Sequence, residues 1–214
     1  MKRMKSLMLI LPALGLACAL GILIPDGKKN VVAETVAEPG NEIVVTIGEV
    51  DRSAIALGDT LRKQRKFNEA IAEYQKVLET QGIPVSLRAE AEYNIGLSHI
   101  WLGEYDQAEA VFNRMLDTYK DDPNAVGYAQ YCIAWVEIQK GKYREAITRL
   151  ERSYAAGSIT DRELAARTQY LIGRTYLMFL DDFANARAMF KKILTVYPDT
   201  HVATHPYITT QKGK

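Results

Sequence analysis

The feature that most constrains the fold of this chain is a block of sequence that recurs four times. Each block has an alanine at the start of the apolar face of its second half, and these alanines follow one another after 38, 38 and 40 residues, at Ala70, Ala108, Ala146 and Ala186. A fixed period in this range is typical of repeat arrays, in which each unit contacts only its neighbours. The chain is therefore expected to fold as an array of similar units.

Two amphipathic helices are predicted within each block, because apolar residues return twice at i, i+3 and i+4. In the second block, Gly96 and Ala108 allow two helix backbones to approach, while the ring of Phe112 fills the space around them. Gly103, between the two helices, suits the left-handed conformation that commonly ends a helix. The pattern covers residues 51–200, for which we expect an all-α domain of four antiparallel helix pairs.

The blocks resemble the tetratricopeptide repeat (TPR), whose pattern has Trp, Leu-Gly and Tyr on the first helix, then Ala and an aromatic residue on the second, then Pro. The residues that carry the resemblance are Leu57-Gly58, Leu61, Phe67 and Tyr74 in the first block, Ile95-Gly96, Tyr105 and Phe112 in the second, Ile133-Ala134, Gly141, Tyr143 and Leu150 in the third, and Ile172-Gly173, Tyr176, Phe183, Phe190 and Pro198 in the fourth. The resemblance implies a right-handed α-solenoid whose first helices line a concave groove.

Four features depart from the common TPR pattern. His99 stands where Tyr is usual, Arg65 replaces the hinge glycine of the first block, and the fourth block has an extra residue between Gly173 and Phe183. The period also exceeds the family's usual ~34 residues. This longer period, together with Tyr-Pro-Asp at residues 197–199, resembles the repeats of bacterial envelope-assembly lipoproteins and Tol-Pal coordinators.

The groove residues are taken from the family pattern. The resemblance places eight residues of the second, third and fourth blocks on the groove face: Tyr93, Leu97, Trp101, Tyr128, Tyr131, Trp135, Tyr170 and Arg174. A groove rich in aromatic rings suits an extended or helical segment of another protein. The alternative is that several of these rings pack between neighbouring repeats, and it applies more to the tyrosines than to the two tryptophans.

An apolar segment without charges, residues 7–24, follows the basic cluster in residues 2–5. As a helix it would span roughly 27 Å, close to the ~30 Å hydrocarbon core of a bilayer. Residues 1–25 are therefore expected to be an uncleaved signal anchor. The alternatives are a signal peptide cleaved at the small residues 17–19, a lipoprotein signal with lipidation at Cys18, and a buried globular helix. The basic start favours a membrane-anchored protein with its repeat domain on the periplasmic side, or else a secreted periplasmic protein or a lipoprotein.

The next segment, residues 26–50, mixes Gly, Pro, Lys and Glu without helical periodicity, so we expect an extended spacer. Within it, residues 42–47 are apolar and β-branched enough to form a strand that adds to a partner's sheet or packs on the first helix. No second strand is evident, so simple packing or plain extension is favoured. Residues 201–214 are expected to be a polar C-terminal tail.

Nothing in the sequence points to catalysis or a cofactor, since Gly-rich phosphate loops and nucleophile motifs are absent. We expect a protein that is not an enzyme. His201 and His205 stand four apart, but no third ligand has convincing spacing, so a polar cap is favoured and no metal is expected. Residues 26–214 contain 24 of the 27 basic residues and all 26 acidic residues, so they have no basic excess. This balance argues against nucleic-acid binding. Cys132 is expected in the core rather than in a disulfide with Cys18.

Together these features predict a non-catalytic scaffold or assembly factor of the cell envelope, which binds envelope or membrane proteins in a preformed groove. The alternative is a self-assembling structural subunit of a larger membrane-associated complex, a homo-oligomer. It follows from the short ending after Pro198, where Tyr207 and Ile208 in a polar tail would leave the last helix pair incompletely capped. A third hypothesis, an enzyme or metal protein, depends only on the pair His201 and His205.

Overall fold

The computed structural model describes residues 31–37, 43–49, 52–205 and 208. The chain divides into two units, Met1–Ala54 and Ile55–Lys214. The apolar residues 7–24, with Cys18 among them, lie outside the described residues, so the anchor and its lipidation stay predictions. Within the described part of the chain, no helix is both long enough and apolar enough to cross a membrane.

The first unit contains a β-hairpin. Strand β1 (Val31–Ala37) pairs antiparallel with β2 (Ile43–Glu49), with Val31 opposite Glu49 and Ala37 opposite Ile43. The expectation of an extended spacer without a second strand is therefore wrong for residues 31–37. The strand was missed because its sequence mixes valines, which favour strands, with Ala and Glu, which do not.

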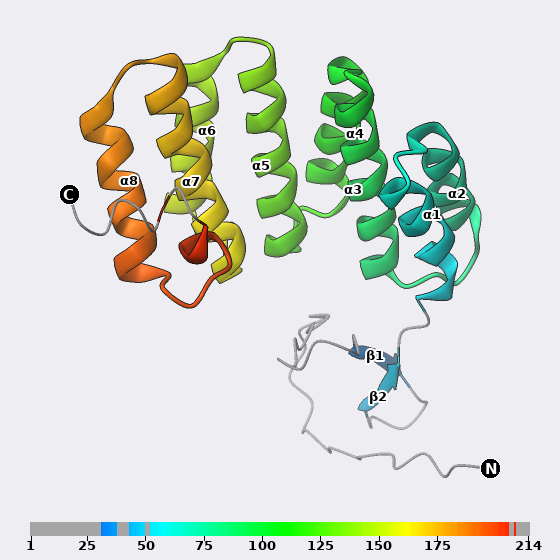
Figure 1. Cartoon of the computed structure of the whole chain (residues 1–214). Helices are drawn as coiled ribbons and strands as arrows, with labels where there is room; N and C mark the ends of the chain where they lie inside the picture. The colour runs from blue at the N-terminus through cyan, green and yellow to red at the C-terminus, as the bar shows by residue number, and fades with distance from the viewer. Residues whose placement is uncertain (1–30, 38–42, 50–51, 206–207, 209–214) are drawn as a thin grey trace. The chain divides into compact units, whose positions relative to one another are not determined.

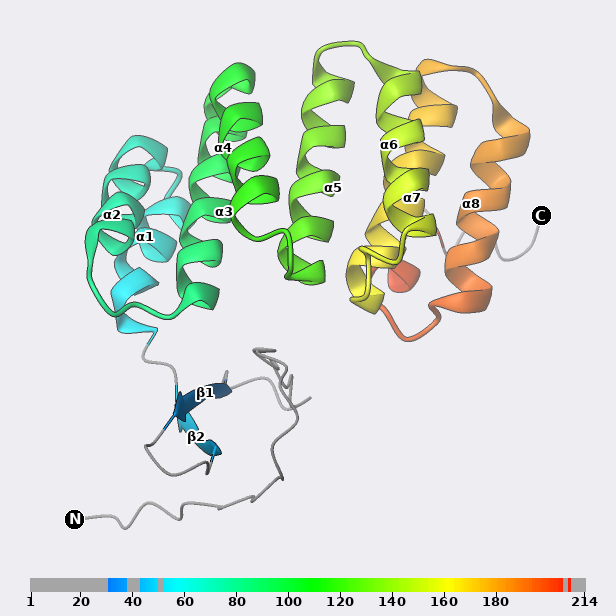
Figure 2. The same ribbon diagram turned by 180° about the vertical axis from the view of Figure 1, so that it is seen from behind.

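Eight α-helices form the described repeat region (Figure 1). They are α1 (Ser53–Lys63), α2 (Phe67–Glu79), α3 (Val85–Leu102), α4 (Tyr105–Thr118), α5 (Pro123–Gln139), α6 (Tyr143–Ala155), α7 (Arg162–Phe179) and α8 (Phe183–Val196). Consecutive helices run antiparallel, and the pairs follow one another in a row, as both views show (Figures 1 and 2). This arrangement confirms the expected all-α solenoid of four antiparallel helix pairs.

A small residue on the first helix packs under a large side chain of the second in every pair. A Cβ added to Gly96 would lie 2.4 Å from Cζ of Phe112, so only glycine fits beside that ring. The same two positions hold Gly58 with Tyr74, Gly173 with Phe190, and Ala134 with Leu150. In the third pair the small residue is alanine instead of glycine, and its partner is leucine instead of an aromatic residue. The interhelical space is therefore filled in all four pairs.

The turn between the two helices of each pair uses a left-handed residue. Gly103 and Gly141 have φ values of 79° and 76°, as the sequence predicts for helix-ending glycines. Arg65 and Asp181 hold the same place in the first and fourth pairs, with φ values of 63° and 52°. The departures from the family pattern at these turns therefore change the residue and leave its left-handed conformation in place.

The C-terminal segment folds back on the last helix pair. A short 3-10 helix, η1 (Val202–Thr204), carries Ala203 into a cluster with Phe190 and Ile193 of α8. Ile208 joins this cluster and is 0% exposed. The expectation that Ile208 lies in a polar tail is therefore wrong, because two adjacent residues, Tyr207 and Ile208, in a polar stretch have no periodicity that would indicate burial.

Candidate partner-binding groove

The eight candidate residues lie on α3, α5 and α7, the first helices of the second, third and fourth pairs. Because the repeats are equivalent, they fall into rows: Tyr93, Tyr131 and Tyr170 hold one position, and Leu97, Trp135 and Arg174 another. Helix α5 packs against both α3 and α7, which brings neighbouring members of each row together. The rows therefore run across these three helices, and that all eight residues line one groove stays a prediction.

All four tyrosines among the candidates are partly buried. The rings of Tyr93 and Tyr128 meet edge to face, with centroids 5.4 Å apart, and both are partly buried. Burial raises the pKa of Tyr93 above its usual range and raises the pKa of Tyr131 to about 12. Both rings lie beside Cys132, which is fully buried as predicted. These tyrosines pack between repeats and present only part of their surface to solvent.

Tyr170 has a further structural contact. Its ring lies 6.1 Å from the ring of Phe190 and 5.5 Å from the ring of His205, centroid to centroid. It therefore packs against both α8 and the C-terminal segment. This contact joins residues 35 positions apart in the chain, and no local sequence pattern indicates it.

The two tryptophans differ in exposure. Trp101 is 52% exposed, although its ring stacks on Phe67 with centroids 6.3 Å apart and planes 9° from parallel. Trp135 is partly buried and meets Trp101 edge to face at 5.9 Å. Phe67 begins α2, so three successive repeats contribute to this aromatic row. Trp101 is thus a large apolar surface that is held in place and left open to solvent.

Sequence reasoning missed one exposed residue on the same face. Met178 of α7 is 61% exposed and stands five residues after Gly173, as Trp101 stands five residues after Gly96. The glycine alignment of the two blocks would have identified it as the counterpart of Trp101. Its flexible thioether side chain adds exposed apolar area on α7.

Arg174 is the charged member of the candidate set and is exposed on α7. Within the described part of the chain, no carboxylate lies within ion-pair distance of its guanidinium. Arg167, two turns earlier on α7, is held by Glu163 at 3.3 Å. The positive charges of Arg167 and Arg174 act to lower the pKa of Tyr131, against the larger effect of burial, which raises it.

The two histidines that sequence analysis considered for a metal flank η1. His201 precedes it and His205 follows it, and the backbone N–H of His201 donates to Glu163 at 2.9 Å. Among the described residues, no group of three or more His, Cys, Asp or Glu side chains is placed to hold a metal ion. The geometry of the pair is that of residues at the two ends of a short helix.

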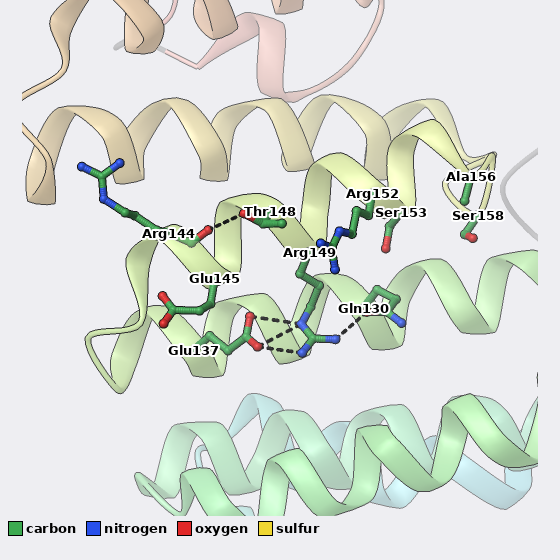
Figure 3. Close-up of a pocket in the computed structure, with 10 residues that line it drawn as sticks. All are labelled: Gln130, Glu137, Arg144, Glu145, Thr148, Arg149, Arg152, Ser153, Ala156 and Ser158. Carbon is green, nitrogen blue, oxygen red and sulfur yellow. Dashed lines mark hydrogen bonds and ion pairs between the residues drawn. The ribbon is translucent and has the colours of Figure 1, made fainter.

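A polar pocket of about 830 Å³ lies over α5 and α6 (Figure 3). It is lined by Gln130, Glu137, Arg144, Glu145, Thr148, Arg149, Arg152, Ser153, Ala156 and Ser158. At its centre Arg149 donates to both oxygens of Glu137, at 2.7 and 3.0 Å, and to the side-chain oxygen of Gln130 at 2.9 Å. The central guanidinium is thus used to hold α6 against α5.

Two models of the tetratricopeptide repeat match the chain, one over residues 55–123 and one over residues 126–199. Among solved structures, the chain is similar to the nearly identical TPR-like repeats of a kinesin light chain from Podosopora anserina, with 16% identity, a TM-score of 0.55, and coverage of 75% of this chain and 80% of that one. It is also similar to MamA from Desulfovibrio magneticus, with 20% identity, a TM-score of 0.48, and coverage of 72% and 79%. No curated protein sequence matches the chain. The chain belongs to the tetratricopeptide repeat family.

Proposed function

We propose that this protein is a non-catalytic scaffold that binds a segment of another protein on the inner face of α3, α5 and α7. The observation that carries the proposal is the exposed ring of Trp101, 52% open to solvent. Without a partner, a large part of this apolar side chain stays exposed to water, and covering it would contribute favourable binding free energy. Tryptophan is also enriched among the residues that dominate binding energy in protein interfaces.

The surroundings of Trp101 favour binding without rearrangement. Phe67 supports one face of the ring and Trp135 meets its edge, so little side-chain freedom remains to be lost when a partner arrives. Leu97 and Met178 extend the apolar surface along and across the helices. A preformed surface of this kind suits an extended or helical segment.

We also propose that the scaffold acts in the cell envelope, tethered through residues 7–24. The support is the uncharged apolar run that follows a basic start. The intact mass of protein purified from membranes tests this proposal. A retained anchor gives the full mass, lipidation adds the mass of the lipid at Cys18, and recovery of the full-length chain only from the soluble fraction would contradict it.

Site-specific photo-crosslinking tests the groove. A photoreactive amino acid at position 101 is expected to give a discrete adduct with a partner protein in intact cells. Asn113, exposed on α4, is the matched control position and is expected to give none. Adducts that are absent from position 101, or the same from both positions, would contradict the assignment of the groove.

A second candidate, end-to-end self-association, has its own observation. Leu57 on α1 is 54% exposed, whereas its counterparts Ile95, Ile133 and Ile172 are covered by the preceding repeat and are 3%, 0% and 1% exposed. Phe183, at the other end of the array, is 67% exposed. Large apolar side chains that are exposed at both ends of the array suit its continuation by another copy.

Light scattering of the full-length chain in detergent tests this alternative. Self-association predicts a mass that rises with protein concentration and that returns to the monomer value in Phe183→Glu. The control is Ala188→Glu, which makes the same charge change at another exposed position of α8. A monomer at all concentrations would exclude end-to-end assembly under those conditions.

A further inference from the structure

If the groove binds a partner as proposed, the side chains along it indicate the chemistry of the segment that it accepts. One row of equivalent positions across three first helices reads Leu97, Trp135 and Arg174. The side chains therefore change along the groove from aliphatic to aromatic to cationic. A segment that crosses the three helices meets an apolar surface on α3 and α5 and a positive charge on α7.

The charge of Arg174 differs from that of the arginines that the fold uses. Arg149 is satisfied by Glu137 and Gln130, and Arg162 binds Asp199 at 2.6 Å. Arg88 donates to backbone carbonyl oxygens at the end of α2 and beyond, at 2.7 Å each. Each of these three guanidiniums joins two elements of the fold. Arg174 has no such use among the described residues, since no carboxylate lies within ion-pair distance.

The position of Arg174 makes it accessible to a ligand. It is exposed on α7, in the row of Trp135. A carboxylate that reaches it stays in contact with solvent, so the pair contributes a modest free energy and a defined geometry on the planar guanidinium. Arg167 is partly neutralised by Glu163, which leaves Arg174 as the cation best placed to receive an acid.

We propose that the groove accepts a partner segment in which an Asp or Glu side chain pairs with Arg174 while apolar or aromatic side chains of the same segment cover Trp101 and Trp135. The two requirements act together, because the apolar contacts supply most of the binding energy and the ion pair fixes the register of the segment. The partner is thus an acidic, apolar stretch of another protein.

Peptide selection on the full-length protein tests the proposal. The probe is a library of random dodecamers fused to the carrier through their C-termini, so that no peptide has a free terminal carboxylate. Peptides selected by the wild-type protein are expected to be enriched in an Asp or Glu at a fixed distance from Trp, Phe or Leu. Selection on Arg174→Glu is expected to replace the acidic residue with Lys or Arg at the same distance.

Arg152→Glu is the matched control, because it makes the same charge change on α6, where Arg152 is exposed at the rim of the polar pocket. It is expected to select the same peptides as the wild type. For one amidated synthetic peptide from the wild-type selection, Arg174→Glu should weaken binding by about tenfold or more, because it removes the ion pair and places two negative charges opposite each other. Equal melting temperatures of the variants would show that folding is intact.

The outcomes separate this inference from the proposed function. Selected peptides that need Trp101 but carry no acidic preference, or whose acidic preference persists in Arg174→Glu, would overturn the inference and leave the groove function in place. Absence of any selected peptide, or selection unaffected by Trp101→Ala, would overturn both.

Discussion

The interior of each helix pair and the inner face of the first helices follow different rules, although both are built from aromatic residues. Inside the pairs, one small and one large residue recur at fixed positions, as with Gly96 and Phe112. On the inner face, equivalent positions hold Leu97, Trp135 and Arg174, which share neither size nor charge. A repeat must fill the same interior space in each unit, and packing also keeps one row of the inner face constant, at Tyr93, Tyr131 and Tyr170. The positions of the inner face that vary are therefore those available for recognition.

Truncating one aromatic residue in each region is expected to give the largest difference in the free energy of unfolding. Phe112→Ala should lower the free energy of unfolding by about 3–5 kcal/mol, because its ring is fully buried against Gly96. Trp101→Ala should lower it by only about 1 kcal/mol, roughly the value of an aromatic pair, because the ring is half exposed. Denaturant unfolding followed by circular dichroism measures both. Equal losses would mean that Trp101 belongs to the core and is unavailable to a partner.

Trp135 is intermediate between the buried Phe112 and the half-exposed Trp101, so its contribution to stability tests whether it belongs to the core or to the groove. It packs partly against the clusters on both sides of α5 while its ring edge meets Trp101. Trp135→Ala is expected to cost about 2 kcal/mol, between the values for an exposed and a buried ring. Thermal unfolding checks this value. Complete unfolding of the domain would place Trp135 in the core and remove it from the groove.

Two arginines allow the same contrast to be tested with charge. Arg149→Ala should lower the free energy of unfolding by about 2 kcal/mol, because it leaves the buried Glu137 without its partner. The loss should stay below that of a fully buried pair, since Arg149 is itself partly exposed. Arg174→Ala should leave stability unchanged within about 0.5 kcal/mol. Chemical denaturation of the two variants tests the difference, and a large loss in Arg174→Ala would show that it serves the fold.

Sequence patterns predicted those parts of the molecule that depend on neighbours along the chain. The helix pairs, the left-handed Gly103 and Gly141, and the buried Cys132 all follow from local periodicity or turn chemistry. Features that depend on distant partners were missed, as with the pairing of residues 31–37 with β2 and the burial of Ile208. The bridge between Arg149 and Glu137 belongs to the same class, because charged residues on two facing helices give no signal until the register of the helices is known.

The groove assignment is only partly accessible from sequence for a related reason. The family pattern indicates which residues share a face, but the exposure of each ring depends on what the neighbouring repeat places over it. Tyr170 is covered by His205 and Phe190, whereas Trp101 lies partly open on Phe67. Phe190 belongs to the same helix pair as Tyr170, Phe67 belongs to the repeat before Trp101, and His205 lies in the C-terminal segment. The repeat position alone therefore does not separate a packing ring from a recognition ring.

The smallest predicted effect concerns the turns that join the two regions, where backbone conformation outweighs residue identity. Arg65 has φ of 63° at the place where Gly103 has φ of 79° in the next pair. A left-handed conformation is strained for a residue with a Cβ and is not strained for glycine. Arg65→Gly should therefore raise the free energy of unfolding by about 0.5–1 kcal/mol, the strain relieved exceeding the entropy that glycine adds to the unfolded chain.

The matched variant is Gly103→Ala, which should lower the free energy of unfolding by about 1 kcal/mol, because no atom within 4 Å would obstruct the added Cβ and only the backbone strain remains. Denaturant midpoints of the two variants measure the opposite signs. A loss of stability in Arg65→Gly would mean that contacts of the Arg65 side chain stabilise the fold by more than the strain of its backbone destabilises it. Opposite signs would show that the first turn keeps a glycine conformation without a glycine, so the repeat geometry persists where its sequence signature has been lost.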